Sequence, residues 1–273
     1  MKKLTGLYLG ILFITLCCKN KEDNSVKNKV ETKEIILKNN DKKYLLNPAK
    51  SDSLCLSETK RAKYDIEMYK GVYVKVICFG CDLKPFENEI IEILKLRKFK
   101  LGIQDISCLT FEGQTQGCYI GYVDMKMTEK FGINYKKIIE KDAEQLFIEK
   151  LKTKNAIINA FHLELNERPK LLIKYNNLDS YDEATVKTGI PLIAKYKNNY
   201  IFTDIELIVE KDGTITSVKA GAVVNDIAEV KAYEKKLTLL ALKTIKKDYN
   251  KWQPGSYKNT IARTKISIRT HFE

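Results

Sequence analysis

The sequence predicts an α+β protein in which a small α+β domain precedes a C-terminal antiparallel sheet covered by one long helix. Three observations predict this class. Residues 259–273 alternate almost strictly between apolar and polar, as in a half-buried strand. Residues 225–252 carry apolar side chains at steps of three and four, which is typical of an amphipathic helix. Residues 211–213, Lys-Asp-Gly, supply a turn between two strand-like segments, so the order is hairpin, helix, strand.

The first 17 residues have the pattern of an export signal. Lys2 and Lys3 precede an uncharged, mostly apolar run from Leu4 to Leu16. That run is shorter than the roughly 20 residues that a membrane-spanning helix needs, so a cleaved signal is expected. An uncleaved short anchor or a plain signal peptide is the alternative.

The end of this run resembles a bacterial lipoprotein signal, because it meets Cys17-Cys18 and then turns sharply polar. The resemblance implies cleavage before a cysteine that receives a diacylglyceryl group and an acyl chain such as palmitate. We assign Cys18 as this residue, with Cys17 as the alternative. The implied location is the cell envelope, anchored by lipid most simply to the outer membrane, on its periplasmic face or at the cell surface.

Residues 18–50 are rich in Lys, Asn, Glu and Asp, which predicts a flexible tether. The chain of 273 residues has a net charge of +13, and removal of Lys2 and Lys3 leaves +11. The lysines are spread along the whole length and form no stripe with interleaved aromatics. We therefore predict a solvated basic surface and no nucleic-acid partner.

The first folded domain is expected over residues 51–180. Its predicted elements are a helix capped by Ser57, a strand at residues 72–77, a helix at 85–99, two strands around Gly113 and an amphipathic helix at 134–152. A polar, unperiodic stretch then separates it from a second domain at residues 185–273.

The second domain is predicted in more detail. A tight turn at Gly213, where glycine accepts a positive φ, follows a strand with one apolar face. A long helix from about residue 225 then leads to the last strand. The residues predicted to face the core are Ile205, Leu207 and Val209 on the first strand, and Ala262, Thr264, Ile266, Ile268, Thr270 and Phe272 on the last.

These residues carry a family resemblance to the C-terminal domain of TonB-type energy transducers, which have a hairpin, a helix, a W-x-P-G loop and a last strand in this order. The match covers roughly residues 190–273, and its motif residues are Asp212, Gly213, Trp252, Pro254 and Gly255. We predict that Trp252 fills the core and that Pro254 and Gly255 turn the chain into the last strand. The chain lacks the Pro-rich spacer and the uncleaved inner-membrane helix of the transducers, so energy transduction is not carried over.

The resemblance implies a partner site at the edge of a sheet, where family members pair with an extended segment of an outer-membrane protein. The implied edge is the last strand. The residues at this edge are Ile261, Arg263, Lys265, Ser267 and Arg269. The basic residues among them fit equally a strand edge protected against aggregation.

Five cysteines remain after Cys17 and Cys18, and an exported protein favours disulfides. Cys108 and Cys118 stand symmetrically about Gly113, which predicts a bridge across a hairpin. Cys78 and Cys81 form a C-x-x-C motif between a strand and a helix, typical of either a structural disulfide or a redox or metal-carrying pair. Cys55 is expected to be buried and free, or paired to another chain.

Other chemistry is sparse. His162 and His271 are the two histidines, and neither lies in a metalloprotease motif; no nucleophile elbow or phosphate loop is present. We predict no catalytic residues, no cofactor and no metal. The leading hypothesis is a non-enzymatic lipoprotein that binds or scaffolds other proteins. The alternatives are a thiol-disulfide or metal-carrying protein using the C-x-x-C motif, and a purely architectural outer-membrane protein.

Overall fold

The protein has the predicted α+β architecture, with helices packed against several small sheets. In the part of the chain that the structure describes, no helix combines the length and apolar character needed to cross a membrane. The expected signal and the lipidation site, Cys18 or Cys17, lie outside the described residues. The computed structural model describes residues 39–78, 81, 83–106, 111–153, 156–172, 183–195, 201–225 and 227–273.

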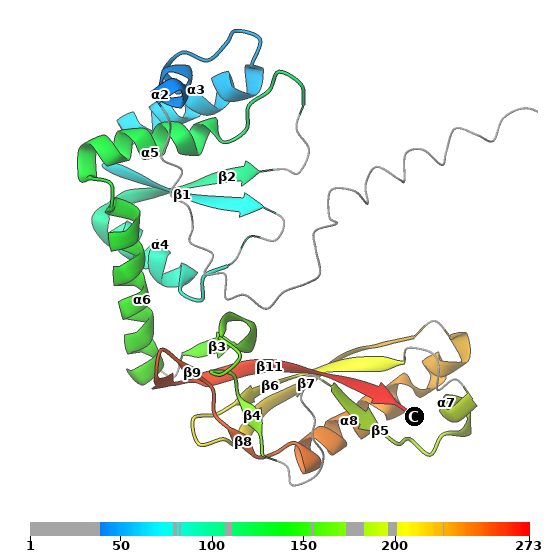
Figure 1. Ribbon diagram of the computed structural model, residues 1–273. Helices are drawn as coiled ribbons and strands as arrows, with labels where there is room; N and C mark the ends of the chain where they lie inside the picture. Colours follow the sequence, from blue (N-terminus) through cyan, green and yellow to red (C-terminus); the bar gives the residue numbers. More distant parts are fainter. Residues whose placement is uncertain are drawn as a thin grey trace, which may run out of the picture. The chain divides into compact units, whose positions relative to one another are not determined.

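The first half is built around a parallel pair of strands, β1 (Gly71–Cys78) and β2 (Phe99–Ile106). Helix α4 (Glu87–Arg97) connects them, because parallel strands need a crossover connection. In Figure 1, α3 (Ser53–Met68) and α5 (Cys118–Phe131) lie on one side of the pair and α4 on the other. Helix α6 (Tyr135–Thr153) packs against α4. Because helices cover both faces, β1 begins with a continuous buried run.

Three segments of this half differ from the prediction. Helix α3 begins at Ser53 and is capped by Asp52 rather than by Ser57. The residues after Gly117 form α5 rather than a second hairpin strand, since Tyr119, Val123 and Met127 recur at four-residue steps and are buried together. Helix α2 (Asn39–Leu46) occupies the end of the predicted tether, and Leu45 on it is only 5% exposed.

A five-stranded sheet organises the second half. Its central strands are antiparallel: β11 (Arg263–Phe272) pairs with β6 (Phe202–Val209), which pairs with β7 (Ile215–Val224). Two short strands, β3 (Ile157–Asn159) and β5 (Glu183–Val186), bind the other side of β11 in parallel. The sheet therefore includes residues from before the boundary predicted at residues 180–185.

Helix α8 (Glu234–Asp248) covers one face of this sheet, as Figure 1 shows. Leu237, Ala241 and Ile245 on α8 are fully buried in the core. Both sets of strand residues predicted to face inward are also buried. The predicted single long helix is divided, because a 3-10 helix, η2 (Ala228–Tyr233), precedes α8.

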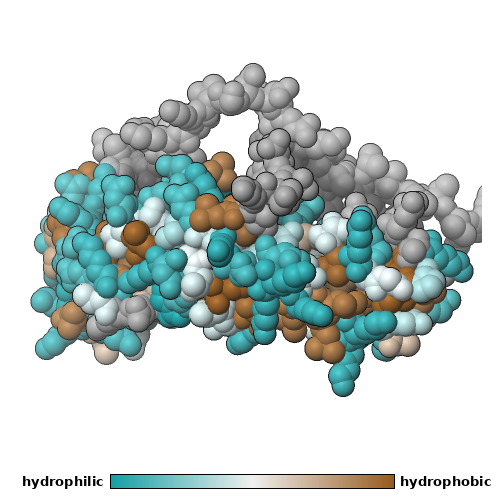
Figure 2. Space-filling model, turned by 90° about the horizontal axis from the view of Figure 1, so that it is seen from below, coloured by the Kyte–Doolittle hydropathy of each residue, from teal (hydrophilic) through white to brown (hydrophobic). Residues whose placement is uncertain are grey.

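Short elements complete the second half. Two-residue strands pair in the loops around the sheet: β4 (Lys170–Leu171) pairs with β8 (Trp252–Gln253), and β9 (Ser256–Tyr257) pairs with β10 (Thr260–Ile261). Hydrophilic residues predominate on the face seen in Figure 2, with smaller apolar groups between them. Two further short elements are η1 (Ala160–His162) and α7 (Pro191–Lys195).

Candidate functional site

The last strand lies inside the sheet, which corrects the prediction that it forms an open edge. Strand β6 pairs along one side of β11, while β3 binds residues 263–265 and β5 binds residues 269–272 on the other. A period-two pattern reveals the buried face of a strand, but it does not reveal which side of its backbone is already paired. The residues predicted for the edge were Ile261, now in β10, and Arg263, Lys265, Ser267 and Arg269 in β11.

The charged residues of this set form cross-strand ion pairs on the face of the sheet opposite the core. Each basic side chain of β11 contacts an acidic side chain on or just beyond β6, and such opposite-charge pairs stabilise a register by a few tenths of a kcal/mol up to about 1 kcal/mol. A hydrogen bond from Arg263 lowers the pKa of Glu210, although burial opposes the shift. The pairs are Arg263–Glu210 (2.6 Å), Lys265–Glu206 (2.8 Å) and Arg269–Asp204 (3.0 Å).

Strand β7 is the long edge of the sheet. It has ten residues, and within the described ranges it pairs with β6 alone. It is irregular in both halves, with a positive φ of 52° at Ser217 and register shifts against β6 between Thr216 and Lys219 and again between Ala220 and Val223. Its second half carries small or exposed residues, including Ala222 and Val224, the latter 47% exposed. This half presents backbone groups to which another strand can bind.

The predicted motif residues form a structural joint between the hairpin and the loop after α8. The Gly213 carbonyl accepts a hydrogen bond from the Trp252 amide at 2.9 Å. Gly213 has a φ of 82°, and a Cβ there would overlap the Trp252 carbonyl oxygen. Asp212 accepts hydrogen bonds from the Thr214 amide (2.9 Å) and hydroxyl (2.6 Å), which fixes the turn. The hairpin turn and the Trp loop therefore hold each other in place.

Trp252 fills the core as predicted. Its side chain is 2% exposed, and its indole N–H donates to the Tyr249 carbonyl at 2.8 Å. Pro254 is half-buried in the loop that follows. Gly255 is buried, and a Cβ there would lie 2.5 Å from the Thr264 hydroxyl and 3.0 Å from Pro169. The W-x-P-G loop is thus close-packed at Trp252 and at Gly255, where it meets Thr264 of β11.

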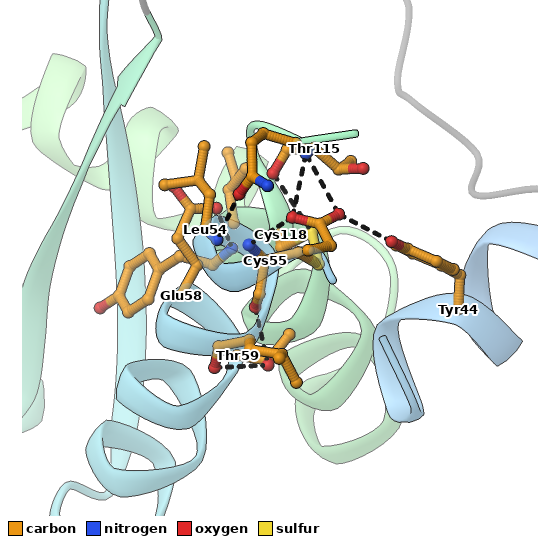
Figure 3. The surroundings of a disulfide bond; sticks show 12 residues. Tyr44, Leu54, Cys55, Glu58, Thr59, Thr115 and Cys118 are labelled. Atoms are coloured by element: carbon orange, nitrogen blue, oxygen red, sulfur yellow. Dashed lines mark hydrogen bonds between the residues drawn. A yellow bond between two sulfur atoms is a disulfide. The ribbon is translucent and has the colours of Figure 1, made fainter. Parts of the chain in front are cut away.

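The predicted bridge between Cys108 and Cys118 is replaced by one between Cys55 and Cys118. Cys55 and Cys118 are 0% and 1% exposed, their Cα atoms are 5.2 Å apart, and they join α3 to α5 (Figure 3). Cys108 lies outside the described residues. The hairpin expectation produced the error, because Cys118 begins a helix rather than a strand. Closing a loop of this length stabilises a fold by roughly 4 kcal/mol in the chain-entropy model.

Asp52 organises the surroundings of this disulfide. Its carboxylate caps α3 through the Cys55 amide at 3.0 Å. It also accepts hydrogen bonds from the Thr115 amide (3.1 and 3.2 Å) and the Tyr44 hydroxyl (2.7 Å), whose convergence Figure 3 shows. Burial alone would raise the pKa of Asp52, but these hydrogen bonds lower it to about 2. One carboxylate thus connects α2, α3 and the loop before α5.

The C-x-x-C motif forms the second disulfide, between Cys78 and Cys81, with Cα atoms 5.3 Å apart. Both residues are half-buried, and Cys78 is the last residue of β1. Lys75 and Glu87 form an ion pair nearby at 2.6 Å. Helix α4 begins only at Glu87, six residues after Cys81, so the motif does not lead directly into a helix.

His162 lies in η1 and contacts the segment that follows this motif. Burial lowers the pKa of His162, while a hydrogen bond with the Leu83 backbone and the charge of Glu87 oppose the shift. Across the residues that the structure describes, no group of three or more His, Cys, Asp or Glu side chains is arranged to hold a metal ion.

Sequence reasoning missed three features of these sites. The Asp52 cap could have been found, since Asp directly before an apolar periodic segment is a helix-start signal. Helix α5 could also have been found from its four-residue spacing. The pairing of β3 and β5 with β11 has no local signal, because both strands are very short and distant in sequence.

Comparisons of this chain with protein-family models, curated proteins and solved structures find no match. The residues themselves therefore carry the functional interpretation.

We predict that Gly213→Ala destabilises the protein more than Gly189→Ala. Both glycines have left-handed φ values, 82° and 63°, but a Cβ at Gly189 meets nothing within 4 Å. The control therefore reports the conformational cost alone, and the Gly213 variant should lose about 2 kcal/mol more because it overlaps the Trp252 backbone. Urea unfolding monitored by Trp252 fluorescence measures both. Equal losses would show that the joint is not close-packed.

We predict that Asp52 stabilises the fold above about pH 4 and loses this effect as the pH falls toward 2. The folded pKa lies below the ordinary value of 3.8, so the ionised form is favoured by folding and protonation removes the gain. Asp52→Asn should lower the free energy of unfolding at neutral pH by about 2 kcal/mol.

Between about pH 4 and pH 2, the free energy of unfolding of the variant should also fall less steeply than that of the wild type. Asp248→Asn is the control, because Asp248 is exposed near the end of α8. An Asp52→Asn protein with the wild-type acid profile would contradict the assignment.

Proposed function

We propose that this chain is a non-enzymatic, lipid-anchored protein of the cell envelope whose C-terminal domain binds another envelope or outer-membrane protein by strand addition. The observation that carries the proposal is β7, which has ten residues and, among the described strands, pairs on one side only. An unpaired strand edge of this length is either protected against association or used for it. In its second half, from Lys219 to Val224, Lys219 is the sole charged residue.

Strand addition would work through the β7 backbone. An extended partner segment gains main-chain hydrogen bonds along the strand, and alternate side chains then determine specificity. Ala220, Gly221 and Ala222 place little bulk in the way of an approaching backbone. The rigid base is β6, which is held between β7 and β11.

The TonB-C-like character of the domain belongs to this proposal. The hairpin with Asp212-Gly213, the covering helix α8 and the W-x-P-G joint support it. The addition of β3 and β5 beside β11 makes β7, rather than the last strand, the edge that we assign to the partner.

The lipid anchor on Cys18 is proposed from the signal-like N-terminus. The two disulfides support an exported protein, because structural disulfides persist in oxidising compartments and are rare in the cytosol. The outer membrane is the location that we propose.

We predict that a photo-crosslinking amino acid at Ala222 captures a partner from intact cells, whereas the same residue at Lys246 does not. Both positions are exposed, one on β7 and the other on α8. Strand addition places partner atoms against β7 alone, so only the first position should give an adduct of defined mass. Adducts of the same mass at both positions, or at neither, would contradict binding at β7.

A second candidate function is thiol-disulfide exchange at Cys78 and Cys81, which the pairing of these residues at the end of β1 favours. Once the pair is reduced by a dithiol, a thiolate of Cys78 or Cys81 would attack a disulfide of a substrate protein, giving a mixed disulfide and then the Cys78–Cys81 bridge. Two electrons and two protons pass from Cys78 and Cys81 to the substrate, whose two cysteines become thiols.

The strand-addition proposal predicts that the protein, reduced by dithiothreitol, does not accelerate insulin reduction. Cys78→Ser is the diagnostic variant, and Cys108→Ser is a matched control outside both pairs. Activity that Cys78→Ser abolishes and Cys108→Ser retains would favour the redox function instead.

A further inference from the structure

Helix α3 has an outer face that the fold leaves open. Its inner face buries Cys55, Thr59, Ala62 and Asp65. The opposite face carries Leu56, Lys60, Tyr64 and Met68 at four-residue steps, and all four are exposed. With the end of α2, they form a surface that we call the α2–α3 stripe. Its members are Leu46 (51% exposed), Leu56 (38%), Lys60, Lys63, Tyr64 (59%) and Met68 (61%).

All members of the stripe except Met68 line one hollow. A shallow hollow of about 550 Å³ lies between the end of α2 and α3, and Leu46, Pro48, Leu56 and Tyr64 line it together with Lys60 and Lys63. Exposed apolar side chains that gather around one depression mark a contact surface more strongly than the same residues scattered singly.

The charge on this surface is mainly positive. Lys60 and Lys63 stand beside the apolar residues, and Lys42 and Lys43 are exposed on α2. The acidic residues of α3 are mostly used elsewhere. Asp65 is 2% exposed and binds Lys100 at 2.6 Å.

Glu58 faces the same interior: it accepts hydrogen bonds from Gln104 (2.8 Å) and from the Tyr119 amide (3.1 Å). Glu67 is the acidic residue that lines the hollow. The stripe therefore pairs apolar side chains with a local excess of lysine.

The position of the stripe in the chain indicates what it meets. Helix α2 begins at Asn39, and 20 residues separate it from Cys18. A fully extended chain of this length spans at most roughly 70 Å. If Cys18 is acylated, as proposed above, α2 is the first described element after the anchor, and its first residue remains within that distance of the bilayer.

We infer that the α2–α3 stripe docks on the surface of an anionic phospholipid membrane. Leu46, Leu56, Tyr64 and Met68 enter the boundary between headgroups and acyl chains, and Lys60 and Lys63 bind lipid phosphates. Apolar burial and attraction of basic residues to anionic lipid act together in such interfacial binding. The inference rests on the proposed envelope location, and it adds a second membrane contact to the lipid anchor.

The test uses residues 19–273 produced without signal or lipid, sedimented with vesicles of phosphatidylcholine and phosphatidylglycerol in equal parts. We expect binding to these vesicles and little to phosphatidylcholine alone. Lys60→Gln with Lys63→Gln should weaken binding about 30-fold, since each basic residue near an anionic leaflet contributes roughly fivefold. Leu56→Ser with Tyr64→Ser and Met68→Ser should weaken it at least about tenfold.

The matched control replaces three apolar residues that are also exposed but lie outside the stripe: Leu96→Ser, Ile138→Ser and Leu239→Ser (74%, 49% and 59% exposed). This variant should bind like the wild type, and circular dichroism checks that all variants fold. Equal losses in the stripe and control variants, or no vesicle binding by the wild type, would overturn the inference. If the wild type is a dimer in sedimentation velocity, and a stripe variant is monomeric but still binds vesicles, the stripe would be a self-association surface instead.

The mass of the native N-terminus tests lipidation separately. If Cys18 is unlipidated and the stripe still binds vesicles, the proposed lipid anchor is wrong and the membrane contact of the stripe stands.

Discussion

Helix α8 packs against β7 and β6, and the hydrophobic core that it shares with β6 and β11 determines the arrangement of the second half of the molecule. Leu237, Ala241 and Ile245 meet a strand face on which every second residue is buried. Because side chains alternate with a period of two, a slip of one residue in β11 would place Arg263, Lys265 and Arg269 in the core. Burial therefore fixes the register, and the ion pairs on the outer face follow from it.

The short strands β3 and β5 determine which edge of this sheet is left unpaired, although they add little to its core. Each binds only a few residues of β11, yet together they occupy most of its second side. An edge that the sequence indicates at the last strand is thus interior, and the long free edge among the described strands is β7. A few hydrogen bonds from distant segments decide which surface is available to a partner, although they contribute little to the buried area.

Periodicity explains both the success and the failure of prediction here. The strand residues from Ile205 to Val209 and from Ala262 to Phe272 have strong alternation, and the structure confirms their orientation. Residues 111–131 carry Gly113 and Gly117, turn signals that suggested a hairpin, while the helical spacing of Tyr119, Val123 and Met127 lies just beyond them. The Cys55–Cys118 bridge was unpredictable from this reading, because its geometry depends on two helices whose contact has no local signature.

The two disulfides act on the fold in different ways. The two cysteines of the buried bridge are 63 residues apart, so the bridge lowers the conformational entropy of the unfolded chain between α3 and α5. The bridge of Cys78 and Cys81 closes a loop with two intervening residues, and in the same chain-entropy model it contributes roughly half as much. Loss of the first would also disturb the hydrogen bonds of Asp52, since the Cys55 amide and the Thr115 amide both bind that carboxylate. The long bridge therefore contributes more to the stability of the first half than the short bridge at the end of β1.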